Sequence, residues 1–424
     1  MPKITEGIAV AVDVQTRAVR GRRMSRFFLL GPAFVAAIAY VDPGNVAANL
    51  TAGSQYGFLL VWVLVVANLM AVLVQYQSAK LGLATGQSLP EFLGKSLKTT
   101  PRRLYWAQAE LVAAATDMAE VIGGAVALNL LFGLPLLAGG FVIGIASMLL
   151  LVLQSRRSQR TFENAIIILL AVIAVGFVTG LMVNLPAPGD VLGGLVPRFD
   201  GVDTVLLAAS MLGATVMPHA IYLHSALARD RHGYSPSEAV RTRLIRITRW
   251  DVIGALVVAG LVNISMLLLA ASSLRGVEGT DTIAGAHAAI SSALGPVVGV
   301  VFGIGLLASG LASTSVGCYA GATIMGGLLN LKIPLVLRRV ITLIPALLVL
   351  GAGIEPTFAL VLSQVLLSFG IPFALIPLIR LTGSRKVMGI HVDSLALKIA
   401  GTLSACLIVG LNIVLITMSL AGNQ

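Results

Sequence analysis

Long apolar runs separated by short polar breaks fill the chain between residues 27 and 420. A helix that crosses a membrane needs roughly 20 predominantly apolar residues, and the breaks gather charged residues, proline and glycine. The pattern therefore predicts eleven transmembrane helices, of which the ninth is short and is expected to begin earlier, near Ile333. The predicted ranges are 27–50, 57–79, 104–131, 135–153, 162–184, 203–228, 250–273, 296–329, 340–353, 357–379 and 399–420.

The composition supports an integral membrane protein. Hydrophobic residues make up 57% of the chain and charged residues 11%, whereas soluble domains carry roughly 25% charged residues. A net charge of +11 would indicate nucleic-acid binding only if the basic residues clustered on a soluble face. They lie between the apolar runs instead, so we predict an all-α polytopic membrane protein with no nucleic-acid partner. Cys318 and Cys406 occupy separate apolar segments, and we expect no disulfide between them.

The distribution of Lys and Arg predicts the orientation in the membrane. Arg198 and Arg275 are the two basic residues on one side of the eleven predicted helices, while the other 27 of the 29 lie on the side of the N-terminal tail. Basic loops stay in the cytoplasm, so the N-terminus is predicted to be cytoplasmic and the C-terminus extracellular. The basic stretch 1–26 is then a cytoplasmic tail, an interpretation preferred over a cleaved signal because the apolar run continues beyond it.

Two interrupted helices indicate an internal repeat. The first predicted helix is broken at Asp42-Pro43-Gly44-Asn45 and the sixth at Met217-Pro218-His219, each past its middle. If helices 6 to 10 repeat helices 1 to 5, the odd number per repeat inverts the second copy, and paired breaks mark the binding site of a transporter. The predicted organisation is a tail (1–26), repeat 1 (27–184), an extracellular loop (185–202), repeat 2 (203–380), and a connection with the last helix (381–424).

The residue types at the breaks favour a transition-metal cation. An unwound turn exposes backbone carbonyls that must face protein or water, and Asp42 and Asn45 add oxygen ligands. Met217 adds a thioether, a soft ligand that shifts the preference from Mg²⁺ or Ca²⁺ towards Mn²⁺, Fe²⁺ or their neighbours. A single methionine in an apolar helix is usually ordinary packing. A carboxylate at the centre of a span, in contrast, costs roughly 3 kcal/mol and is functional by default.

The third predicted helix carries three carboxylates at spacings of seven and three. Glu110, Asp117 and Glu120 fall on one helical face, and such close carboxylates do not all ionise in a low dielectric. That property suits a proton relay. The alternative is a set of structural ion pairs, and Arg338 and Arg339 at the start of the ninth helix fit either reading.

Two histidines follow the second break. His219 and His224 are five residues apart and lie on different helical faces, which argues against a zinc site of two histidines on one helix. His219, two residues from Met217, is placed to titrate near the metal, and either histidine alternatively serves as a satisfied polar residue of the bundle.

Four segments together resemble the Nramp (natural resistance-associated macrophage protein) family, whose bacterial members are proton-coupled manganese importers. They are "AYVDPGNVAANL", "TDMAEVIGG", "GATVMPHAIYLHSAL" and "LVLSQVLLSFGIPFALIPL", and the similarity runs from about residue 28 to residue 380. The resemblance implies a leucine-transporter-like fold with an inverted five-helix repeat plus one extra helix, in the plasma membrane of a bacterium.

The resemblance also implies a ligand set and a proton route. The metal would be bound by Asp42, Asn45, the Met217 sulfur and the carbonyls of Ala39 and Ala214, with Gln364 joining when the site is occluded. The implied proton route involves Asp42, His219, Asp117 and Glu120, with Arg338 and Arg339 beyond them and Glu110 on the same face. One segment departs from the family: "STSVGCYAGATIMGGLLNLKIP" has Ala322 or Thr323 and Gly326 where Gln and Glu are expected, which concerns cytoplasmic gating.

The prediction is a proton-coupled secondary importer of divalent transition metals that works by alternating access. It has no cofactor, its substrates are the metal ion and protons, and its medium is the lipid bilayer. The main alternative is a sodium-coupled amino-acid symporter of the same fold, although Asp42 would repel a substrate carboxylate. An intramembrane hydrolase or metalloprotease lacks a visible nucleophile with its base or a histidine pair, and a channel is left open. The sequence does not rank the affinities for Mn²⁺, Fe²⁺, Co²⁺, Zn²⁺ and Cd²⁺, and it does not give the number of protons transported per metal ion. It is compatible with a monomer.

Overall fold

The computed structural model describes residues 32–156, 159–331 and 333–421, in which every regular element is helical. The predicted tail 1–26 and the first residues of the first predicted span lie outside these ranges. The first half of the chain contains α2 (Pro32–Ile38), η2 (Ala39–Val41), α3 (Pro43–Tyr56), α4 (Val61–Thr85), α5 (Leu89–Ser96), α6 (Thr99–Phe132), α7 (Leu136–Arg156), α8 (Gln159–Val183) and α9 (Pro188–Gly193). The second half contains α10 (Gly201–Thr215), α11 (Pro218–His232), α12 (Glu238–Ser273), α13 (Ile283–Leu294), α14 (Pro296–Leu329), α15 (Leu335–Gly351), α16 (Pro356–Thr382), α17 (Arg385–Met388), η3 (Gly389–His391) and α18 (Leu395–Ala421).

The helices follow the predicted spans in order, with longer bounds. In the described part of the chain, eight helices are long and apolar enough to cross a membrane. The first, fourth and ninth predicted spans coincide with α2–α3, α7 and α15, so the number eleven remains a prediction. The predicted start of the seventh span, residue 250, is wrong as a helix boundary, because α12 begins at Glu238. Hydrophobicity marks the part of a helix that lies in lipid, whereas a polar turn continues the same hydrogen-bond ladder in water.

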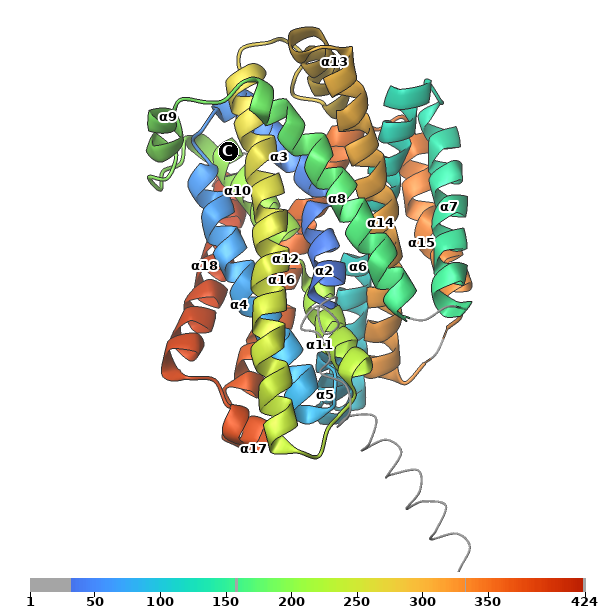
Figure 1. Cartoon of the computed structure of the whole chain (residues 1–424), viewed down its shortest axis with the longest axis vertical. Helices are drawn as coiled ribbons and strands as arrows, with labels where there is room; N and C mark the ends of the chain where they lie inside the picture. The colour runs from blue at the N-terminus through green and yellow to red at the C-terminus, as the bar shows by residue number, and fades with distance from the viewer. Residues whose placement is uncertain (1–31, 157–158, 332, 422–424) are drawn as a thin grey trace, which may run out of the picture. The chain divides into compact units, whose positions relative to one another are not determined.

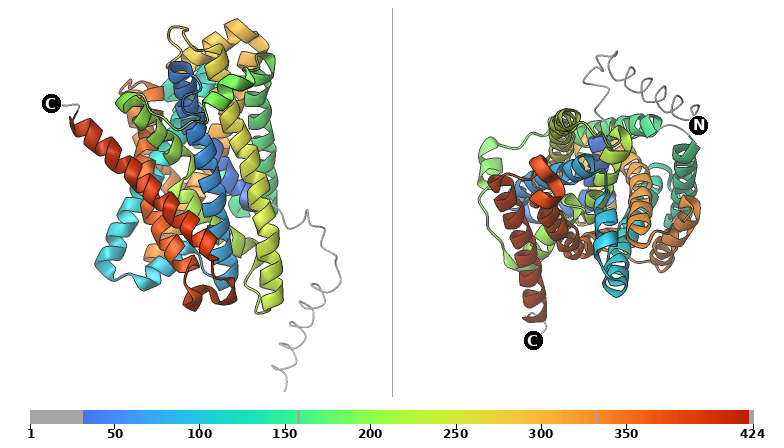
Figure 2. Two further views of the ribbon diagram at one scale, coloured as in Figure 1. Left: turned by 90° about the vertical axis from the view of Figure 1, so that its left-hand side faces the viewer. Right: turned by 90° about the horizontal axis from the view of Figure 1, so that it is seen from below.

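The two interrupted helices lie inside the bundle, flanked by long continuous ones (Figure 1). The packing is paired: α3 packs on α12 as α11 packs on α4, and α6 packs on α16 as α14 packs on α8. In each comparison the second contact joins the helices that correspond, in the other predicted repeat, to the two helices of the first contact. The last helix, α18, lies outside this arrangement against α10 and α16 (Figure 2).

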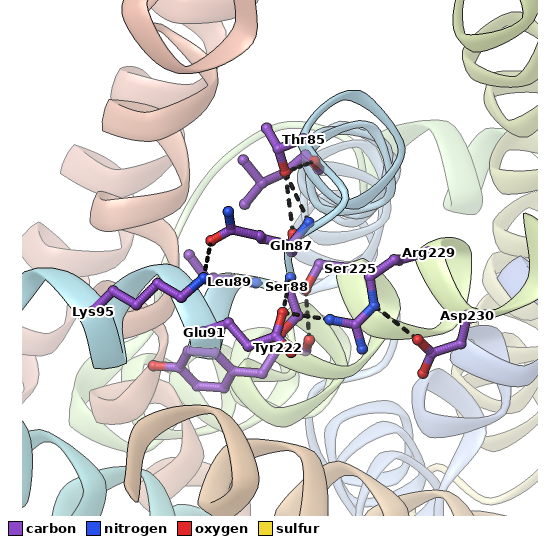
Figure 3. Close-up of polar contacts among 11 residues, drawn as sticks. Thr85, Gln87, Ser88, Leu89, Glu91, Lys95, Tyr222, Ser225, Arg229 and Asp230 are labelled. Carbon is purple, nitrogen blue, oxygen red and sulfur yellow. Dashed lines mark hydrogen bonds and ion pairs between the residues drawn. The ribbon is translucent and has the colours of Figure 1, made fainter. Parts of the chain in front are cut away.

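The hydrophobic pattern did not predict the short helix α5. This helix contacts α11 at the end of the bundle that carries α17. The backbone N–H of Leu89 donates to Ser225 Oγ at 2.9 Å, and Glu91 forms an ion pair with Arg229 of α11 (Figure 3). Burial opposes the charge of Glu91, but the Ser88 backbone N–H and Arg229 outweigh it and hold the pKa of Glu91 below its usual range.

Beside this ion pair lies a cavity of about 560 cubic ångströms between α5, α11 and α14. Ala322, Thr323 and Gly326, the positions at which the sequence departs from the family pattern, line it together with Glu91 and Arg229. The departure therefore concerns this cavity and lies apart from the two helix breaks.

Candidate metal centre

The first break follows from the covalent chemistry of proline. Pro43 has no N–H, so the Ala39 carbonyl four residues earlier cannot receive an α-helical hydrogen bond. The chain tightens into η2 over residues 39–41, and Asp42 adopts an extended conformation with φ −78° and ψ 167°. This is the conformation that a following proline imposes, and it confirms the predicted interruption.

The second break repeats this pattern. Pro218 lies four residues after Ala214, whose carbonyl again loses its helical donor. Met217 is extended, with φ −65° and ψ 121°, and precedes the first residue of α11. In each break a proline therefore removes the α-helical donor of one alanine carbonyl.

The side chains of the two breaks meet. Asn45 Nδ2 donates to Asp42 Oδ1 and to the carbonyl of Ala214, both at 2.8 Å. From α16, Gln364 Nε2 lies 3.4 Å from Asp42 Oδ2, so three helices contribute to one small polar centre. Thr215 Oγ1, 3.5 Å from Asn45 Oδ1, is a neighbour that the sequence did not indicate.

All six residues predicted to contact the metal are buried. Asp42, Asn45, Ala214, Met217 and Gln364 have no exposed surface, and Ala39 is 1% exposed. Met217 packs in the same buried cluster as Ala39 and Val41 of the first break. The centre is therefore closed to solvent.

The donor set suits a cation. The Asn45 amide nitrogen bridges a carboxylate oxygen and a carbonyl oxygen, which is the position of a positive charge between two acceptors. A metal ion taking that position requires the Asn45 amide to turn so that its oxygen becomes a ligand. Among the described residues, no group of three or more His, Cys, Asp or Glu side chains is arranged to hold a metal ion. The polar atoms that the two breaks bring together are those of a carboxylate, an amide and a backbone carbonyl.

The three predicted relay carboxylates are arranged along α6 beside α15. Glu110 Oε1 lies 2.6 Å from Arg338 Nη1, and Asp117 Oδ1 lies 3.6 Å from Arg339 Nη1. Both arginines are buried, so the ion pairs considered from sequence are present. Glu120 is also buried. Its carboxylate lies beside that of Asp117, because a Cβ at Gly317 of α14 would be 2.8 Å from Glu120 Oε2 and 3.0 Å from Asp117 Oδ1.

The two histidines point to different helices, as their spacing predicted. His219 Nδ1 lies 3.4 Å from Thr116 Oγ1 of α6, on the side of the relay carboxylates. His224 Nδ1 lies 2.7 Å from Gln75 Oε1 of α4. Both imidazoles are buried, and His224 belongs to a polar contact outside the relay.

Comparison with known proteins identifies the family. The model of natural resistance-associated macrophage protein-like sequences, Nramp, matches residues 33–418. The chain belongs to the Nramp family.

Relatives and solved structures agree with this assignment. The divalent metal cation transporter MntH of Mycobacterium tuberculosis (strain ATCC 25618 / H37Rv) is 58% identical over 396 residues, which cover 93% of this chain and 92% of that protein. A structure of a variant manganese transporter from Eremococcus coleocola matches with a TM-score of 0.84 at 29% identity, over 95% of this chain and 89% of that one. MhsT in complex with L-phenylalanine matches with a TM-score of 0.57 at 15% identity, over 92% and 97% of the two chains. That last likeness shows the fold alone, and it is the leucine-transporter-like fold expected from the sequence.

This Nramp chain holds its first break with residues that sequence reasoning missed. Asn263 of α12 donates to the Tyr40 carbonyl at 2.7 Å, and Ser309 of α14 donates to the Val41 carbonyl at 2.6 Å. These bonds satisfy two of the three carbonyls of η2, and no such side-chain donor reaches Ala39 in the described structure. A lone amide within "GLVNISMLL" was the available signal for Asn263.

A second missed contact lies on the α4 side of the break. Gln75 Nε2 donates to the Tyr40 hydroxyl, while Gln75 Oε1 accepts from His224. The Tyr40–Gln75–His224 chain thus connects η2 to α11 through α4. Polar residues in an apolar span were the signal, but the sequence does not say which of them meet.

Proposed function

We propose that this protein imports divalent transition-metal ions, with Mn²⁺ and Fe²⁺ as the leading substrates, and couples their entry to protons. The observation that carries the proposal is the convergence of Asp42, Asn45 and the Ala214 carbonyl from two helix breaks, with Gln364 beside Asp42 and Met217 buried within the second break. Hard oxygen donors with one soft sulfur suit the later first-row metals better than Ca²⁺ or Mg²⁺. The relatives named as divalent metal cation transporters and manganese transporters support the same substrate class.

Transport proceeds by alternating access between two inverted repeats, 27–184 and 203–380. The paired packing of α3 on α12 and α11 on α4 supports this division. The metal enters from outside, binds between the breaks and leaves inward as the bundle containing them rocks against the remaining helices. The excess of basic residues on one side supports a cytoplasmic N-terminus in a bacterial plasma membrane.

Proton coupling follows from competition at Asp42. A carboxylate coordinates a metal only when it is deprotonated, so metal binding displaces a proton. Glu120, near enough to Asp42 to be repelled by its charge, receives that proton. Asp117 then carries it towards Arg339, and Glu110 with Arg338 lies one further step along α6.

An amino-acid symporter on this fold is disfavoured by the geometry. Gln364 packs directly over Gly44, so a substrate group on that side of the first break would have to displace the Gln364 amide. The fixed carboxylate of Asp42 would also face the carboxylate of an amino acid.

The decisive experiment is uptake into proteoliposomes with an internal pH dye. Mn²⁺ uptake should saturate, acidify the lumen and increase with an inward proton gradient. Uptake without acidification would refute the coupling, and uptake that does not saturate would indicate a channel. Asp42→Ala should abolish high-affinity uptake.

The thioether is tested with two methionine variants. Met217→Ala should retain Mn²⁺ uptake and lose much of its discrimination against Ca²⁺. Met211→Ala, which removes an equally buried methionine from α10 away from the break, should keep that discrimination. Equal Ca²⁺ exclusion in the two variants would assign Met217 to packing alone.

A further inference from the structure

The end of the bundle that carries α9 contains a cavity of about 740 cubic ångströms. Arg198 and Arg275 line it, and they are the two basic residues on the face that we propose to be extracellular. Within the described ranges, neither guanidinium takes part in an ion pair or a hydrogen bond, although Asp190 and Asp200 line the same cavity. Two exposed guanidinium groups without a protein partner are available to an anion.

An apolar groove continues from this cavity. The volume of the groove is about 260 cubic ångströms, and the groove lies between α4, α10 and α18. Phe199 lines both the groove and the polar cavity, and its ring meets that of Trp62 edge-on with centroids 5.4 Å apart. Tryptophan side chains such as that of Trp62 are enriched at the membrane–water interface. The polar cavity therefore lies at headgroup level and the groove on the hydrocarbon side.

The depth of the groove corresponds to one leaflet. It reaches Leu212, eleven residues beyond the first residue of α10, Gly201. At 1.5 Å per residue this is about 17 Å, close to half of a hydrocarbon core roughly 30 Å thick. Leu407 and Val414 of α18 form the outer wall. An extended acyl chain fits this length, and a soluble anion would use none of it.

We propose that this composite site binds one phospholipid with an anionic glycerol-phosphate headgroup from the outer leaflet. The phosphate lies between Arg198 and Arg275, and one acyl chain fills the groove. Asp190 and Asp200 accept hydrogen bonds from the headgroup hydroxyls, which a choline headgroup lacks. The lipid thereby joins α18 to α4 and α10 at the outer end of the bundle.

The test measures lipid binding to purified full-length protein by native mass spectrometry and by the melting temperature in detergent. Phosphatidylglycerol should bind and raise the melting temperature, whereas phosphatidylcholine with the same chains and inorganic phosphate should not. Arg198→Gln/Arg275→Gln should weaken phosphatidylglycerol binding by roughly tenfold for each guanidinium removed. Arg103→Gln, an exposed arginine at the opposite end, is the matched control.

A second pair of variants tests the groove separately. Gly410→Leu fills the groove, because nothing lies within 4 Å of a Cβ at Gly410, and it leaves both arginines in place. It should also lose phosphatidylglycerol binding, while Gly254→Leu, at an equally open lipid-facing position of α12, should not.

Four outcomes would overturn the proposal. Unchanged phosphatidylglycerol binding in the double arginine variant would exclude the headgroup contact. Unchanged binding in Gly410→Leu would exclude the acyl chain from the groove, and equal stabilisation by inorganic phosphate would replace the lipid by a soluble anion. Equal binding of phosphatidylcholine would make the groove a general lipid contact.

Discussion

Gly44 provides the sharpest test of how Gln364 contributes to the metal centre. A Cβ at Gly44 would lie 1.8 Å from Gln364 Nε2, whereas ordinary contact begins at 3.4 Å. Gly44→Ala therefore forces the Gln364 amide away by about 1.6 Å on that contact distance. Its approach to Asp42 Oδ2, already 3.4 Å, is then lost. The substitution itself removes no predicted ligand. The cost of moving the buried Gln364 side chain, about 1–3 kcal/mol, is partly offset by the higher helix propensity of alanine, up to about 1 kcal/mol.

The metal-binding free energy of Gly44→Ala should be weaker by about 1.5 kcal/mol, the lower limit for a hydrogen bond to a charged group. This loss corresponds to roughly tenfold weaker metal binding. Mn²⁺ titration calorimetry should show this loss for Gly44→Ala and for Gln364→Ala alike. The double variant should bind no more weakly than Gln364→Ala, because both changes remove the same contact. Gly254→Ala, at an open position, should bind as the wild type does. Normal Mn²⁺ binding by Gly44→Ala, or a roughly hundredfold loss in the double variant, would refute the role of this contact.

Three further predictions address the supports of the centre, the relay and the α5 ion pair. Asn263→Ala leaves the buried Tyr40 carbonyl without its donor, so the free energy of unfolding should fall by about 1–3 kcal/mol. The affinity for Mn²⁺ should fall as well. Ser265→Ala, whose hydroxyl bonds within its own helix, should change neither in the same denaturation and titration assays. Glu120→Gln should retain Mn²⁺ uptake while proteoliposomes no longer acidify, and normal acidification would remove Glu120 from the relay. Because the folded-state pKa of Glu91 is lowered, its charge stabilises the protein above the unfolded pKa of about 4.3 and the effect is lost on acidification. The melting temperature of Glu91→Gln should therefore lie below that of the wild type at pH 7, with the gap closing as the pH falls below about 4 and through the lowered folded-state pKa. A gap independent of pH would contradict a charge effect.

Much of the fold was predictable because lipid imposes a strong constraint on composition. Each of the eight helices long and apolar enough to cross a membrane coincides with a predicted apolar run, since a spanning segment must satisfy its own backbone and present apolar side chains. Helix ends were less predictable. The start of α12 at Glu238 lies in a polar, arginine-rich stretch that reads as a loop by hydropathy.

The centre itself was predictable in part. Asp42 and Asn45 carry their own signal, because polar groups beside a proline in an apolar span require a reason. Gln364 came from family resemblance, and its packing on Gly44 is visible only in the structure. Asn263, Ser309 and Gln75 were missed because an isolated polar residue in a helix does not reveal its partner.

The sequence by itself determined where the helices break. Pro43 and Pro218 act through covalent geometry on the residues immediately before them, so Ala39 and Ala214 lose their helical donors in any packing arrangement. The tertiary structure decided that the two breaks share one centre. The bond from Asn45 to the Ala214 carbonyl spans 169 residues, and such a contact depends on how whole helices pack. The same holds for Arg198 and Arg275, which read in sequence as two exceptions to a charge rule and lie in the structure around one cavity.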